Sequence, residues 1–133
     1  MDKPLIVVNF KTYETAMGDS ALTLAKAMDD FTGRDFRMIA VVSAFDLSTI
    51  SNSVSSVEVW SQHLDPVGKG SHTGWLEPDL ALHHGAVGTI INHAEHKVNM
   101  GHVEKLMAML PSDFPICACA ADVDEAIALA KLG

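Results

Sequence analysis

The sequence predicts an α/β fold in which consecutive strand–helix units build one parallel sheet. Short apolar runs of strand length alternate with amphipathic stretches along the 133 residues, and the pattern occurs five times. Because each predicted strand is followed by a helix before the next strand begins, neighbouring strands are expected to run parallel. We expect residues 1–133 to form a single domain.

The composition indicates a folded protein with an acidic surface. Apolar residues make up 48% of the chain, charged residues 20%, and the net charge is −8. A negative surface argues against binding to nucleic acid or to an anionic membrane. The N-terminal apolar run is too short for a signal peptide or a membrane span, so we expect a cytoplasmic protein. Cys117 and Cys119 suit a reducing compartment and are expected to be small core residues.

The first half of the chain is predicted to hold three strands, at residues 5–9, 36–43 and 57–63. A helix is predicted over residues 15–31, because Ala21, Leu24, Ala25 and Met28 recur at helical spacing. Shorter helices are predicted over residues 44–52 and 77–84. A Gly-rich loop at residues 66–74 precedes the second of them.

The second half is predicted to hold two further units. Strands are expected at residues 86–91 and 116–119, and helices at 99–110 and 122–132. Asp122 is a plausible N-cap for the last helix. Five units suit a doubly wound sheet or part of a (β/α)8 barrel. The Gly-rich phosphate loop expected after the first strand of a doubly wound sheet is absent, so no large anionic cofactor is expected there. A full barrel needs roughly 200–250 residues.

Polar side chains stand at the C-terminal ends of two predicted strands, which is where barrels build their active sites. Asn9 and Lys11 follow the first strand and lie on one face of it, offering a hydrogen-bond donor and a cation to an oxyanion or phosphate. His93 and Glu95 follow the fourth strand. Backbone N–H groups at the start of the next helix would favour a neutral His93 imidazole that can donate to a carbonyl.

Simpler interpretations stay open for each residue taken alone. Lys11 can extend into solvent, His93 can be a satisfied structural residue, and Glu95 can be a favourable carboxylate at a helix N-terminus. If the strand ends converge, Glu95 can pair with Lys11. The seven histidines show no HExxH and no zinc-ribbon cysteine spacing, so no metal site is expected.

In combination these motifs resemble triosephosphate isomerase of the archaeal type. Asn9-Phe10-Lys11 is similar to the family's first-strand motif, and Gln62-His63 to its third-strand motif. Residues 70–74 resemble its third loop, which in the family reaches into a neighbouring subunit. The segment at residues 88–95, GTIINHAE, resembles its fourth strand with the catalytic His, and Cys119 its fifth-strand Cys. The resemblance implies a TIM barrel, truncated here to about five βα units.

The resemblance also implies roles. Asn9 and Lys11 would bind dihydroxyacetone phosphate or glyceraldehyde 3-phosphate, His93 would polarise the carbonyl as a neutral electrophile, and Glu95 would orient Lys11. No cofactor or metal is implied, and the reaction belongs to glycolysis and gluconeogenesis. Two departures stand out: Ala94 replaces the family's Ser, and the general-base Glu expected after a sixth strand has no counterpart in these residues.

Three hypotheses therefore stand. In the first, the chain is the N-terminal part of a triosephosphate isomerase, inactive alone, that acts as a homo-oligomer or with a complementing C-terminal chain. In the second, it is a non-catalytic partial-barrel module that associates with another chain. In the third, it is a self-contained five-stranded α/β protein.

Overall fold

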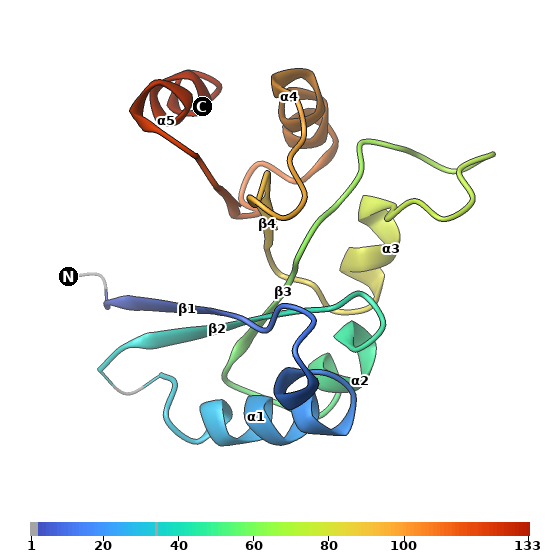
Figure 1. Ribbon diagram of the computed structural model, residues 1–133. Coiled ribbons are helices and arrows are strands. Elements are labelled where there is room, and N and C mark those ends of the chain that lie inside the picture. The colour runs from blue at the N-terminus through green and yellow to red at the C-terminus, as the bar shows by residue number, and fades with distance from the viewer. Residues whose placement is uncertain (1–2, 34) are drawn as a thin grey trace.

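The structure is a computed structural model that describes residues 3–33 and 35–133. Five strands alternate with helices along the chain (Figure 1). The strands are β1 (Leu5–Asn9), β2 (Arg37–Val42), β3 (Glu58–Ser61), β4 (Thr89–Ile91) and β5 (Ile116–Ala118). The helices are the 3-10 turn η1 (Glu14–Ala16), α1 (Asp19–Asp29), α2 (Leu47–Ser51), α3 (Pro78–His83), α4 (Met100–Met109) and α5 (Val123–Ala130).

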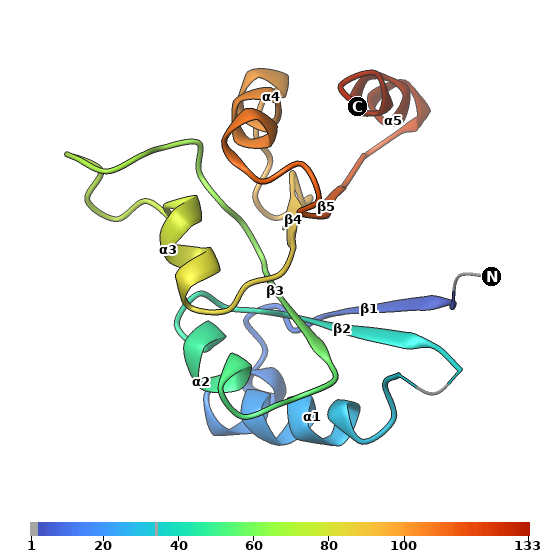
Figure 2. The same ribbon diagram turned by 180° about the vertical axis from the view of Figure 1, so that it is seen from behind.

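All neighbouring strands pair in parallel, in the order β1-β2-β3-β4-β5, as the sequence predicts. The sheet curls into an open half-barrel with the helices on its outer side, which the two views from opposite sides show (Figures 1 and 2). Pairing is uneven along the sheet. Five residue pairs join β1 to β2, but only Ser61 and Thr89 are paired between β3 and β4. The β3–β4 junction is therefore where the sheet is held by the fewest ladder bonds.

The helix predicted over residues 15–31 is wrong in one respect, because it is broken near its start. Residues Glu14–Ala16 form a 3-10 turn, and α1 begins only at Asp19. Between them Gly18 has a φ of 60°, a conformation that costs a glycine little but interrupts a helix. The Gly18 N–H donates to Asp46 Oδ2 at 3.1 Å, so a contact from the next unit fixes the break.

Helix ends follow the sequence more closely. The Asp122 carboxylate accepts the Glu125 N–H at 2.8 Å, which confirms Asp122 as the N-cap of α5. Asn99 caps α4 in the same way through the His102 N–H. The fourth strand is shorter than predicted. Gly88 lies against the Trp60 ring, and ladder pairing of β4 begins only at Thr89.

The two faces of the sheet are covered differently. The outer face packs on the helices through the main core, which includes Ala40, Val42, Val59 and Ile91. The inner face carries a smaller cluster formed by Ile39, Val41, Trp60 and Ile90.

The expectation that both cysteines are core residues is wrong, since Cys117 is exposed and Cys119 only partly buried. Cys117 is in register with Ile90, on the inner side of β5. Ile116 and Ala118, which alternate with it, pack toward the helices. No helix in the described part of the chain is long and apolar enough to cross a membrane.

Candidate active site

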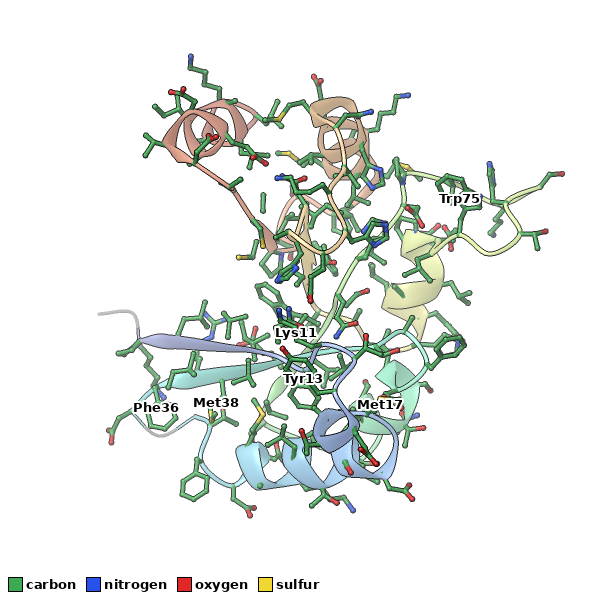
Figure 3. All side chains as sticks on the ribbon, in the orientation of Figure 1. Lys11, Tyr13, Met17, Phe36, Met38 and Trp75 are labelled. Carbon is green, nitrogen blue, oxygen red and sulfur yellow. The ribbon has the colours of Figure 1, made fainter. Side chains whose placement is uncertain are left out.

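The ends of β1 and β3 hold a hydrogen-bonded group around Asn9 and Lys11. Asn9 Oδ1 accepts the backbone N–H of Lys11 at 2.9 Å, and Gln62 Nε2 donates to the Lys11 carbonyl at 2.9 Å. These bonds fix the backbone just past β1, where Lys11 has a φ of 57°. Figure 3 shows Lys11 at the end of β1, in the space between the α1–α2 layer and the α4–α5 layer.

Lys11 and Asn92 are the two non-glycine residues with a left-handed φ in the part of the chain that the structure describes. Each follows the end of a strand. Lys11 is itself a predicted site residue, and Asn92 directly precedes His93. Left-handed backbone is unfavourable for a side chain with a Cβ and persists only where the surroundings enforce it. Such positions concentrate at functional sites, so both outliers mark this edge of the sheet.

The end of β4 brings His93 and Glu95 to the same place. Lys11 Nζ lies 3.2 Å from Glu95 Oε1, so the pairing that the sequence suggested is present. Glu95 is 63% exposed, so this ion pair contributes little to stability.

His93 Nδ1 faces its own turn, where it accepts a backbone N–H and lies 3.5 Å from Glu95 Oε1. The Glu95 backbone N–H donates to His93 Nδ1 at 3.1 Å. In a neutral ring the proton then resides on Nε2, which becomes a donor. Helix α4 begins only at Met100, so it does not supply this N–H. The donor N–H belongs to a turn closed by His96 N–H on the His93 carbonyl at 2.8 Å.

Residues to which the sequence assigned no role hold this turn in place. Asn92 is buried. Its Nδ2 donates to the Cys119 carbonyl and to Glu125, and its Oδ1 accepts the Val98 N–H at 3.0 Å. Lys97 pairs with the same Glu125 carboxylate. These contacts lower the pKa of Glu125, most strongly through the Lys97 hydrogen bond. The position of Asn92, between the fourth strand and His93, was the one local signal that could have revealed these hydrogen bonds.

Lys11, His93 and Glu95 line one open cleft of about 670 Å³. Asn9, Gln62, His63, Asp65 and His96 also line this cleft. Burial lowers the pKa of His63, although its hydrogen bond to Asp65 acts in the opposite direction. The cleft thus offers a cation, an imidazole and amide groups, a set suited to a small anion that carries a carbonyl.

Comparison with known proteins supplies the family. The sequence profile of triosephosphate isomerase matches residues 4–127. The chain belongs to the triosephosphate isomerase family. It is 34% identical over 134 residues to the triosephosphate isomerase of the archaeon Methanothermus fervidus. That alignment covers 99% of this chain and 60% of the relative. It is 37% identical over 101 residues to that of Archaeoglobus fulgidus, covering 75% and 45% of the two chains.

A solved relative confirms the fold. The crystal structure of triosephosphate isomerase from Bartonella henselae superposes with a TM-score of 0.79 at 18% identity, covering 98% of this chain and 61% of that one. The five parallel units are therefore units of a TIM barrel, as predicted. The chain spans about 60% of the length of the relatives that match all of it.

Proposed function

We propose that this chain supplies the anion-binding and carbonyl-polarising part of a triosephosphate isomerase, which interconverts dihydroxyacetone phosphate and glyceraldehyde 3-phosphate. The observation that carries the proposal is the convergence of Lys11 and His93 on one cleft, with His93 Nδ1 occupied and Nε2 left as the donor. Family membership supports the substrate class.

Each residue then has a role. Asn9 and Lys11 bind the phosphorylated triose, and the Lys11 cation stabilises negative charge as it develops. His93 Nε2–H donates to the carbonyl oxygen as the enediolate forms, and Glu95 holds Lys11 in place. The base that removes the carbon-bound proton is a Glu after a sixth strand, on whichever chain carries that strand.

In this proposal residues 1–133 are a partial TIM-barrel domain, and the working site forms when three further units close the barrel. The protein is cytoplasmic, needs no cofactor and works as a homo-oligomer or with a complementing chain. Residues 1–133 alone are expected not to isomerise triose phosphates above the solution rate, since a positioned base is worth roughly 10²–10⁴-fold.

Complementation tests the proposal. A chain carrying strands six to eight of the Methanothermus fervidus relative is mixed with this one, and isomerisation is followed in a coupled assay. We expect activity only in the mixture. Lys11→Met and His93→Gln should each lower its rate roughly a hundredfold, about the loss of one preorganised donor to the oxyanion. Lys69→Met and His83→Gln, at exposed positions outside the cleft, are the matched controls and should leave the rate unchanged.

A second candidate is a non-catalytic module that associates with another chain. Its support is α5, which has no buried residue and leaves Val123 and Ile127 exposed at 73% and 50%. A complex that forms with native-like circular dichroism but stays inactive, or is indifferent to Lys11→Met, would favour this module over the isomerase.

A further inference from the structure

A cluster of three potential metal ligands lies outside the proposed catalytic group. It consists of His63, Asp65 and His102. His63 and Asp65 follow β3, and His102 stands in the first turn of α4. Their side chains are 7%, 10% and 15% exposed, so all three are largely withdrawn from solvent.

The distances between the ligand atoms lie on both sides of the ligand–ligand distance found around a tetrahedral metal ion. One nitrogen or oxygen from each residue lies within 4.8 Å of the others. His63 Nε2 is 2.7 Å and His102 Nε2 is 3.9 Å from Asp65 Oδ1. Bonds of about 2.0–2.2 Å at tetrahedral angles place ligand atoms roughly 3.3–3.6 Å apart. One of these distances is shorter and the other longer than this range, so the side-chain ends must shift to seat an ion.

We propose that His63, Asp65 and His102 bind a divalent transition metal, and that Zn²⁺ fits this donor set. Two imidazole nitrogens and one carboxylate oxygen match zinc and disfavour Mg²⁺ and Ca²⁺, which prefer oxygen ligands. His63 and Asp65 line the cleft, which leaves a fourth position accessible for water. The sequence predicts no metal, because these ligands match no short zinc motif.

The present hydrogen bonds show what metal binding must displace. His63 Nε2 donates to Asp65 Oδ1, and His102 Nε2 donates to the Leu64 carbonyl at 2.9 Å. As ligands, both rings use the Nε2 lone pair and carry the proton on Nδ1. Asp65 is already oriented for the task, because its second oxygen accepts the Leu76 N–H at 2.8 Å.

The position of the site gives binding a structural consequence. His102 belongs to α4, which follows β4, whereas His63 and Asp65 follow β3. An ion held by all three would cross-link the two sides of the β3–β4 junction, which has a single ladder pair. Because a bound metal stabilises the folded state that presents its ligands, Zn²⁺ is expected to raise the melting temperature.

The test uses the purified full chain after treatment with a chelator. Zn²⁺ is titrated by calorimetry and Co²⁺ by visible absorption, and melting is followed with and without Zn²⁺. We expect one ion per chain, the intense absorption of tetrahedral Co²⁺, and no response to Mg²⁺. His102→Gln should weaken Zn²⁺ binding at least tenfold and abolish the melting shift, since Gln can still donate to the Leu64 carbonyl.

The surface pair His83 and His84 provides the matched control. Its rings lie edge to face with centroids 5.1 Å apart, and both residues are exposed. The double variant H83Q/H84Q should bind Zn²⁺ as the unaltered chain does. The proposal is overturned if the unaltered chain binds no Zn²⁺, if binding survives in His102→Gln, or if it disappears in the control. Should His102→Gln fail to fold, as judged by circular dichroism, His63→Gln is measured against the same expectations.

Discussion

The two parts of the sheet on either side of the β3–β4 junction are both built from parallel strand–helix units, but their helices are buried to different degrees. Helix α1, in the first part, buries Ala21, Ala25 and Met28 against the core. Helix α5, in the second part, has no buried residue. Strands β1 and β2 share five residue pairs, and β4 and β5 share three. The helix of the last unit is therefore less covered than the helix of the first.

The sharpest test of this contrast is to remove one large apolar side chain from each helix. Met28→Ala, at a position 5% exposed, should lower the free energy of unfolding by about 2–5 kcal/mol, because it leaves a cavity. Ile127→Ala, at a position 50% exposed, should cost about 1 kcal/mol or less. Urea denaturation followed by circular dichroism measures both. Equal losses would mean that α5 is buried in solution, by association or by another packing.

The junction itself can be tested at Gly88. A Cβ added there would lie 2.2 Å from the Trp60 ring, closer than side-chain atoms approach. Gly88→Ala should therefore displace the start of β4 and cost about 1–3 kcal/mol. Gly68→Ala, where nothing lies within 4 Å of an added Cβ, is the matched control and should be near neutral. A tolerated Gly88→Ala would show that the Trp60 ring can shift away from the start of β4 without loss of stability.

The smallest expected effect concerns two carboxylates, one in each part. Asp29 accepts N–H bonds from Val57, Ser56 and Ser55. Burial raises the pKa of Asp29, but the three N–H bonds together lower it by more, so the net shift is downward. The pKa of Glu125 is lowered by Lys97 and the Ala121 N–H. A depressed folded-state pKa gives stability that is present above the ordinary values of 3.8 and 4.5 and is lost as pH falls through the folded value.

Asp29→Asn and Glu125→Gln should each destabilise the chain near neutral pH and make stability fall less steeply between about pH 5 and pH 2. Melting temperatures measured across this range, with Asp113→Asn as the control at an exposed carboxylate, check the prediction. A variant that keeps the slope of the unaltered chain would show that its carboxylate has the same pKa folded and unfolded.

The sequence by itself determined the order of the five strand–helix units, the helix cap at Asp122, and the strand-end motifs that resemble the family. These features depend on side-chain periodicity and on hydrogen bonds within one helical turn, so a short stretch of chain contains all the information. The identity of Asn9, Lys11, His93 and Glu95 as candidates has the same origin, because polar groups at the ends of apolar runs are visible without coordinates.

Only the tertiary structure decided which distant groups meet. The curl of the sheet sets the distance of 3.2 Å between Lys11 Nζ and Glu95 Oε1, and it brings His102 to His63 and Asp65. It also leaves Cys117 exposed, although a small apolar side chain in a predicted strand was expected in the core. Distances between residues far apart in the chain depend on strand twist, on register and on what covers each face. Packing across the whole sheet sets those quantities, so no local sequence pattern predicts them.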